Sequence, residues 1–209
     1  MLFLDELTEW PRAVLDVLRE PLESGRIVIS RAARQAEFPA RFQLVAAMNP
    51  CPCGYAGDPS GRCRCSPDVI GRYRGRVSGP LLDRIDLQVE VPRVPQAELR
   101  GEAPPGEDTA TVRARVVACR DRQLARNGGP NAWLQGETLL KHCALRPPEQ
   151  KLLDRVVDRF GLSARAYHRL LKLARTIADL GQSERIESAH LAEAISYRKF
   201  DRADTQAAA

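Results

Sequence analysis

The sequence predicts an α/β segment over residues 1–95, a linker at 96–108, an all-α domain over 109–200 and a disordered tail at 201–209. Three observations support this fold class. Short apolar runs in the first fifty residues are typical of strands buried in a parallel sheet. A stretch rich in proline, glycine and acid at 101–108 is typical of a linker. Four amphipathic stretches come after it, as expected of helices that bury one face.

The composition fits a globular protein. The 209 residues are 44% hydrophobic and 28% charged, which excludes disordered, collagen-like and mucin-like classes. The sequence shows neither a membrane-spanning apolar run nor a secretory leader, so we expect a cytoplasmic protein without a membrane partner. Its formal charge of +5 comes from 28 arginines and 4 lysines against 27 acids and mildly favours an anionic partner.

The first strand is predicted at Met1–Glu6, where four apolar residues precede two acids. Thr8 as N-cap and Pro11 in the first turn predict a helix that runs to about Leu22 and that Gly25 ends. The residues expected to face inward are Val14, Leu15, Leu18 and Leu22.

A hairpin and a second buried strand are predicted next. The strand-like runs Arg26–Ser30 and Arg41–Ala47 flank a basic segment from Arg31 to Glu37, and Asn49-Pro50 closes the second run. Residues 50–68 are rich in cysteine, proline and glycine and lack periodicity, which predicts an irregular loop.

The α/β segment is expected to continue with a short helix to Arg76, a helical turn within Gly79–Asp86, and a strand at Leu87–Val91 that Pro92 and Pro95 end. Beyond the linker, helices are expected at Thr109–Arg126, Pro148–Phe160, Ser163–Leu180 and Ser188 to about Tyr197.

Asp5 and Glu6 are candidate functional residues. Nucleotide hydrolases use adjacent acids at a strand end to place one carboxylate on a Mg²⁺ shell and the other beside the attacking water. Alone the pattern is weak, because a solvated strand end gives the same residues. The order of the later motifs strengthens it: a second buried strand ending in Asn49, then Leu81–Asp86, then Ser163–Arg165 in the helical region.

Taken together, these motifs resemble the C-terminal half of the magnesium-chelatase-like AAA+ ATPases of the YifB/ComM group. The segments that carry the resemblance are Leu2–Leu7 (Walker B), Glu23–Ile29 (hairpin), Ala46–Pro50 (sensor 1), Cys51–Gly54 with Cys63–Cys65, Ser78–Asp86, Leu162–Ala166 and Ala174–Leu180. The fold implied is an incomplete AAA+ P-loop core followed by a helical lid, with ATP and Mg²⁺ as cofactors of the complete protein.

The resemblance also implies roles for single residues. Asp5 would hold the Mg²⁺ shell, Glu6 would polarise the lytic water, and Asn49 would orient that water or the γ-phosphate. Arg84 would be an arginine finger in the next subunit's site, and Arg165 would reach the γ-phosphate from the lid.

Without the resemblance, two of these residues have simpler interpretations. Arg84 would form an intrachain ion pair with Asp83 or Asp86. Arg165 would be a solvated residue on an amphipathic helix.

The sequence departs from the family in lacking a P-loop, which ends in Gly-Lys-Ser/Thr. None of the lysines, Lys141, Lys151, Lys172 and Lys199, is preceded by a glycine. In the family that loop and its strand precede Walker B, so we expect Met1 to be an internal start or a truncation. We also expect a gap in the sheet between the strand ending at Asn49 and the strand Leu87–Val91, and no ATP hydrolysis by this chain alone.

Four cysteines lie close together in the irregular loop. Cys51-x-Cys53, nine residues and Cys63-x-Cys65 supply the four thiolates of a closed tetrahedral Zn²⁺ site. Reduced thiols or a redox-labile pair are the alternative interpretation.

Arginines cluster in two places and suit contacts with a phosphate backbone. The first cluster, around the hairpin, is Arg26, Arg31, Arg34 and Arg41, and the second, around the cysteine loop, is Arg62, Arg64, Arg72, Arg74 and Arg76. On composition alone a solvated basic face or an intersubunit surface is an equal alternative.

The resemblance favours DNA, because related hexameric motors point such hairpins into a central pore. It implies a homohexameric motor that couples ATP hydrolysis to branch migration or unwinding of single-stranded or branched DNA, during recombination in natural transformation. The alternatives are a chelatase motor for metal insertion into a tetrapyrrole and a non-catalytic, zinc-stabilised DNA- or protein-binding module.

Overall fold

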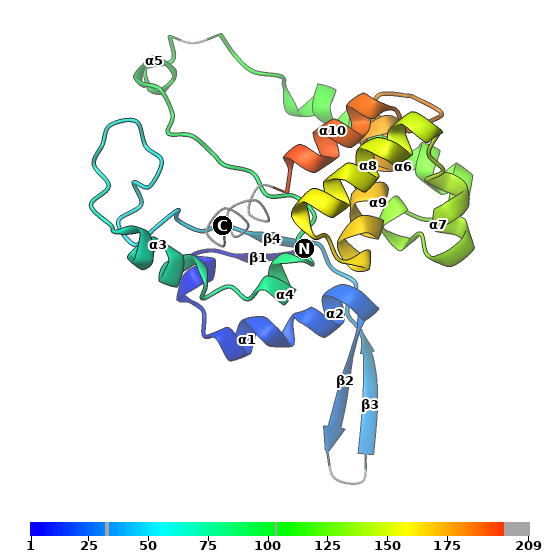
Figure 1. Cartoon of the computed structure of the whole chain (residues 1–209), viewed down its shortest axis with the longest axis horizontal. Coiled ribbons are helices and arrows are strands. Elements are labelled where there is room, and N and C mark those ends of the chain that lie inside the picture. Colours follow the sequence, from blue (N-terminus) through cyan, green and yellow to red (C-terminus); the bar gives the residue numbers. More distant parts are fainter. Residues whose placement is uncertain (32–33, 103, 199–209) are drawn as a thin grey trace. The chain divides into compact units, whose positions relative to one another are not determined.

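The structure is a computed structural model that describes residues 1–31, 34–102 and 104–198 (Figure 1). The chain divides into two compact units, Met1–Ile85 and Asp86–Ala209, and each contains its own hydrophobic core. Helices and small sheets are both present, so the chain has a mixed α/β fold. The tail predicted at 201–209 lies outside the described residues.

The first unit combines two small sheets with short helices. Its elements are β1 (Leu2–Leu4), the 3-10 helix η1 (Leu7–Glu9), α1 (Arg12–Val17), α2 (Arg19–Ser24), β2 (Arg26–Arg31), β3 (Arg34–Pro39), β4 (Leu44–Ala46), α3 (Pro67–Arg74) and α4 (Gly79–Leu82).

β1 and β4 form a parallel pair with Leu4 opposite Ala46 and Phe3 opposite Val45. One face of the pair packs on a core centred on Leu4, Leu7, Leu15, Val77 and Leu81. The other face is open, with Phe3 56% and Val45 37% exposed. The prediction that both strands are buried on both faces was therefore wrong, because alternate side chains point to opposite faces and the core covers only one.

The single helix predicted from Pro11 to Leu22 is divided into α1 and α2. Pro21 gives a physical reason, because it has no backbone N–H to continue the helical ladder from α1. Leu15 is buried, as expected, whereas Val14 is 47% exposed and faces away from the core.

β2 and β3 form the predicted antiparallel hairpin, with pairing from Arg26↔Pro39 to Arg31↔Arg34. Its second strand lies inside the segment expected to connect the strands, and the strand expected at Arg41–Ala47 is the shorter β4. Gly25 ends α2 with φ of +71°, as expected of a helix-terminating glycine.

The strand predicted at Leu87–Val91 is not formed. Leu87, Val89 and Val91 are exposed, and Gln88 donates its backbone N–H to the Tyr197 carbonyl at 2.9 Å. The alternating pattern is present, but a strand also needs a neighbouring main chain to pair with, and among the described residues no strand lies beside it.

The regular elements described in the second unit are all helical. They are α5 (Gln96–Leu99), α6 (Thr109–Asn127), the 3-10 helix η2 (Asn131–Trp133), α7 (Gly136–His142), α8 (Pro147–Phe160), α9 (Ala164–Leu180) and α10 (Ser188–Ser196). The four predicted helices are α6, α8, α9 and α10, whereas α5, η2 and α7 were not predicted. In the part of the chain described, no helix is both long and apolar enough to cross a membrane.

The core of the second unit is built around α9. Leu170, Leu171, Ala174 and Ala178 of this helix are buried against residues such as Leu153 of α8. Ser163 caps α9 by accepting a hydrogen bond from the Ala166 N–H at 3.2 Å.

Candidate functional site

Asp5, Glu6 and Asn49 lie at one edge of the parallel strand pair. The two acids come directly after β1, and Asn49 comes shortly after β4. The Ala47 N–H donates to the Leu4 carbonyl at 2.9 Å, so the two strand ends lie side by side. All three candidate side chains are exposed and accessible to a ligand.

The chain turns sharply at Glu6, which has φ of 49° and ψ of 50°. A residue with a Cβ in this left-handed region is strained by about 1–2 kcal/mol, and such strain is often found at functional sites. Two hydrogen bonds fix the turn. The Asp5 Oδ1 accepts from the Glu6 N–H at 2.9 Å, and the Asp5 carbonyl accepts from the Trp10 Nε1–H at 3.0 Å.

The four cysteines of the loop converge. The Sγ atoms of Cys51, Cys53, Cys63 and Cys65 all lie within 4.8 Å of one another. The separations are 3.3 Å for Cys51–Cys53, 3.8 Å for Cys51–Cys63 and 3.7 Å for Cys53–Cys63. A tetrahedral Zn²⁺ with bonds of about 2.3 Å would place its sulfur ligands about 3.8 Å apart. The predicted ligands are therefore arranged for a metal of this size.

The electrostatics of the cysteine cluster also favour a cation. Burial opposes ionisation of Cys51, but hydrogen bonds from the Cys53 thiol and the backbone N–H groups of Ala56, Cys53 and Tyr55 lower its pKa to about 6. A backbone hydrogen bond at Cys53 acts to lower the pKa of Cys65, but thiol contacts, burial and the charge on Cys51 together raise it to about 11. A thiolate at one cysteine thus disfavours ionisation of the next thiol. A bound cation would offset this repulsion and allow all four thiols to ionise.

The polypeptide around the cysteines is held by local hydrogen bonds. Gly54, at φ of +78°, donates its N–H to the Cys51 carbonyl at 2.9 Å. Arg74 of α3 donates from Nε to the Pro50 carbonyl at 3.1 Å. Because Pro50 is the residue after Asn49, this hydrogen bond lies at the point where the cysteine loop follows the strand end.

Several arginines of the second predicted cluster have intrachain partners. Arg62 stacks over the Tyr55 ring, with its Cζ 5.8 Å from the ring centroid, and Arg76 lies at the same distance from Tyr73. Arg76 also pairs with Glu9 at 3.2 Å. These contacts are compatible with a nucleic-acid surface and equally with a stabilised loop.

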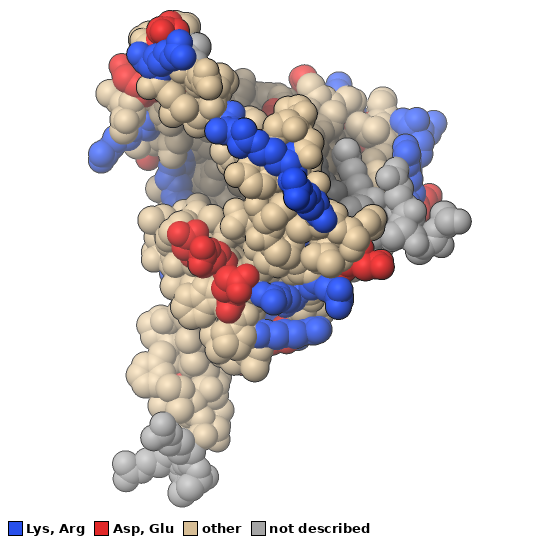
Figure 2. Space-filling view, turned by 90° about the vertical axis from the view of Figure 1, so that its left-hand side faces the viewer, with Lys and Arg blue, Asp and Glu red and all other residues tan. Residues whose placement is uncertain are grey.

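The hairpin contains one arginine with an intrachain partner among its described side chains. Arg26 pairs with Glu37 at 3.0 Å, and the side chains of Arg31 and Arg34 lie outside the described residues. On the face drawn in Figure 2 most of the described hairpin surface carries no charge. Its exposed large apolar residues are Ile27, Ile29 and Phe38.

Arg84 lies inside the first unit. Its side chain is 7% exposed and pairs with Glu23 through Nη2. Nε donates to the Arg19 carbonyl at 3.0 Å, and Nη1 donates to the Pro80 carbonyl at 2.6 Å. The simpler interpretation expected an intrachain ion pair with Asp83 or Asp86, whereas the partner found for Arg84 is Glu23. Asp86, a partner considered from the sequence, pairs with Arg169 at 2.6 Å.

Arg165 belongs to the first turn of α9 in the second unit and is exposed. This position fits the solvated helix residue expected from the sequence alone.

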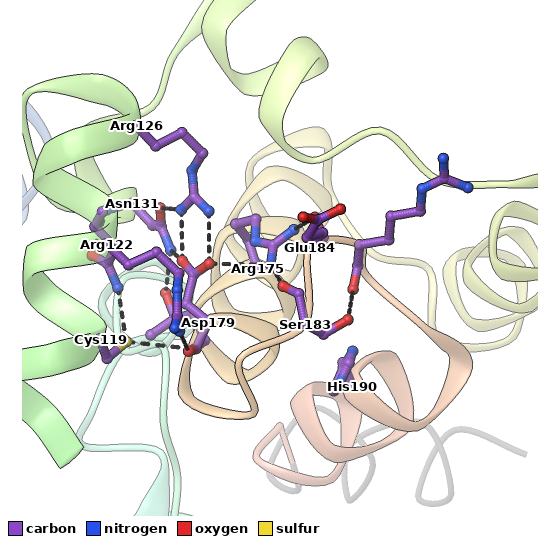
Figure 3. A network of polar contacts seen from close by, with 12 residues as sticks. Cys119, Arg122, Arg126, Asn131, Arg175, Asp179, Ser183, Glu184 and His190 are labelled. Carbon is purple, nitrogen blue, oxygen red and sulfur yellow. Dashed lines mark hydrogen bonds and ion pairs between the residues drawn. The ribbon is translucent and has the colours of Figure 1, made fainter.

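The second unit contains a buried ionic network that its sequence did not predict (Figure 3). Asp179 of α9 is 0% exposed and accepts two hydrogen bonds from Arg126 at 2.6 Å each. It also accepts one from the Asn131 Nδ2 at 2.8 Å and pairs with Arg175 at 3.1 Å. Arg175 in turn donates to the Ser183 carbonyl at 2.6 Å. Arg175 and Asp179 lie within the family-characteristic segment Ala174–Leu180. That motif is the signal in the sequence that could have pointed to these two residues.

The comparisons with protein families identify this chain as a magnesium-chelatase-like protein. Residues 1–99 match the family model described as magnesium chelatase, subunit ChlI. Residues 106–198 match the model for the C-terminal part of the same subunit.

Individual relatives give the same result. The chain is 50% identical over 203 residues to competence protein ComM of Haemophilus influenzae. The matched region covers 97% of this chain and 39% of the relative. The chain is also 50% identical to the uncharacterized protein YifB of Escherichia coli, with 97% and 40% covered. An uncharacterized Mycobacterium tuberculosis protein is 39% identical, with 95% and 40% covered. The chain belongs to the YifB/ComM family of magnesium-chelatase-like proteins, and it spans about two fifths of the length of these relatives.

Proposed function

We propose that this chain forms part of an ATP-driven, hexameric AAA+ motor that acts on DNA in the cytoplasm. The observation that carries the proposal is the placement of Asp5, Glu6 and Asn49 at adjacent ends of two parallel strands. Two carboxylates and an amide at such an edge supply a metal-shell ligand, a base for water and a hydrogen-bonding group within one small region.

Each residue then has a chemical task. Mg²⁺ is commonly bound by one or two carboxylates together with substrate phosphates, and the exposed Asp5 fits that requirement; when bound, the ion would neutralise charge on the phosphates. Glu6, held in its left-handed turn, would orient and polarise the attacking water. Asn49 would hold that water or the γ-phosphate from the neighbouring strand. Arg165 would contribute positive charge from the helical unit.

The four cysteines are proposed to hold a structural Zn²⁺. The thiolate set and its spacing suit zinc, and the ion would fix the loop that continues directly from Asn49. Its contribution is therefore to the stability and placement of the strand end and not to the chemical step.

DNA is proposed as the macromolecular partner, as single strands or branched molecules contacted through their phosphates. The arginines of the cysteine loop and hairpin, together with the formal charge of +5, support this partner. The Haemophilus relative is named a competence protein, which fits a role in recombination of incoming DNA. The description of the matching family model favours a chelatase motor as the second candidate.

An ATPase assay separates these candidates. The sample is a fusion in which a P-loop-bearing segment of the family precedes this chain, and Glu6→Gln in the same fusion is the control for the chemical step. A DNA motor should hydrolyse ATP faster when single-stranded or branched oligonucleotides are added, and Glu6→Gln should abolish the stimulation. A rate of ATP hydrolysis that DNA leaves unchanged but a tetrapyrrole raises would support the chelatase and refute the DNA motor.

A further inference from the structure

Three of the groups that hold the guanidinium of Arg84 come from two places in the chain. The Pro80 carbonyl lies in α4, four residues before Arg84 itself. The Arg19 carbonyl and the Glu23 carboxylate both come from α2. Only one of these acceptors carries a full negative charge, so Glu23 alone adds the attraction of an ion pair to its hydrogen bond.

Glu23 itself is placed by the structure around it. It lies in the last turn of α2, which Gly25 ends at a φ of +71°. Ser24, the next residue, donates its hydroxyl to the Glu20 carbonyl at 3.0 Å and accepts the Arg26 N–H at 3.2 Å. The Glu23 side chain is 44% exposed, while the Arg84 side chain that it holds is 7% exposed. Glu23 is therefore the more solvent-accessible member of the pair.

We propose that Glu23 is a positioning residue that holds Arg84 withdrawn against α2, so that loss of this contact exposes the guanidinium. The inference rests on the proposed function in one respect: Arg84 matters for hydrolysis only if it is the finger for a neighbouring subunit. An arginine held in this way cannot at the same time extend to phosphoryl oxygens outside its own unit, so Glu23 would compete with the nucleotide for the same donors.

The test measures chemical accessibility of Arg84 in the 209-residue chain. Phenylglyoxal, which modifies arginine side chains, is added to the native chain, and the rate at Arg84 is read from its peptide by mass spectrometry. In the wild-type chain Arg84 should react much more slowly than Arg12, whose side chain is 66% exposed. Glu23→Ala should raise the rate at Arg84 about tenfold or more, the factor expected when a hydrogen bond to a charged group is lost.

Glu23→Gln and Glu37→Ala are the matched variants. Glu23→Gln keeps the shape and one acceptor oxygen, so it should give an intermediate rate. Glu37→Ala removes an acid from the exposed pair with Arg26 and should leave Arg84 unchanged. Amide exchange of β1 and β4 is measured in parallel, because a purely structural role for Glu23 would raise exchange throughout the unit, whereas a positioning role raises reactivity at Arg84 alone.

Besides a rise in amide exchange throughout the unit, two results would overturn the inference. The first is rapid modification of Arg84 in the wild-type chain, and the second is a rate at Arg84 that Glu23→Ala and Glu23→Gln leave unchanged. Neither depends on nucleotide. If an ATPase fusion with Arg84→Ala hydrolyses ATP normally, the finger role that the resemblance implies for Arg84 in the motor fails, while the positioning of Arg84 by Glu23 is still decided by its reactivity.

Discussion

Replacing Asp179 by Asn tests whether the buried network of the second unit stabilises the fold. The substitution keeps the size of the side chain and removes its charge. Arg175, which is 2% exposed, and Arg126 would then have no carboxylate at the centre of the network. The new amide also turns one acceptor oxygen into a donor that faces a guanidinium or the Asn131 amide, both of which are donors.

The expected loss of folding free energy follows from the burial of this ion pair. Removing one partner of a buried ion pair costs about 3–5 kcal/mol, because the remaining charge is uncompensated. The matched control is Glu107→Gln, which breaks an exposed pair with Arg115 at 2.8 Å and should change stability far less, because solvent screens that pair. Urea unfolding followed by circular dichroism measures both. A loss below about 1 kcal/mol for Asp179→Asn would refute the assignment of a stabilising role to the network.

The wild-type chain and Asp179→Asn should also differ with pH in a defined direction. Burial acts to raise the pKa of Asp179, but hydrogen bonds from Arg126 and Asn131 and the nearby positive charges lower it overall. A carboxyl whose pKa is lowered by folding contributes stability that is full above its unfolded pKa of about 3.9 and is lost as the pH falls through the folded value. The advantage of wild type over Asp179→Asn should therefore be constant near neutral pH and shrink below about pH 4.

Three further predictions concern the candidate site. The chain purified without chelators should contain one Zn²⁺, and Cys53→Ser or Cys63→Ser should release it; elemental analysis that finds no metal in the wild-type chain would contradict this. The chain alone should not hydrolyse ATP, and phosphate release that Glu6→Gln abolishes would show otherwise. In a fusion carrying a P-loop, Arg84→Ala should retain nucleotide binding while hydrolysis falls about 10³-fold or more. Mixing that variant with Glu6→Gln should restore some activity, and unchanged hydrolysis by the assembled Arg84→Ala protein would refute the finger role.

The helices of the second unit were predictable because their signals are local. Asp108 accepts the Thr111 N–H at 2.7 Å, and Ser163 caps α9 in the same way. Amphipathic periodicity and such caps are contained within a few neighbouring residues. The 3-10 helix η2 and α7 lack a comparably long apolar period, and both went unpredicted.

Contacts distant in the sequence could not be predicted in the same way. The pairing of Arg126 with Asp179 joins residues 53 positions apart, and no local pattern distinguishes a buried Asp from a solvated one. The strand expected at Leu87–Val91 shows the converse, since a correct local alternation does not form a strand unless another main chain lies beside it.

Asp5, Glu6 and Asn49 lie between these two cases. Their proximity was expected from the resemblance, which gives them roles around one nucleotide, and the parallel pairing of β1 and β4 agrees with it. The partner of Arg84 could not be predicted in this way. A motif match proposes that its guanidinium serves a neighbouring subunit, yet the same planar set of donors is satisfied within the chain by Glu23 and two carbonyls. Phosphate and carboxylate present similar oxygens to an arginine, so a residue suited to the first is also held well by the second. The sequence therefore shows that residue 84 can bind phosphate oxygens. Whether it does so depends on whether its guanidinium is bound to Glu23 at the time.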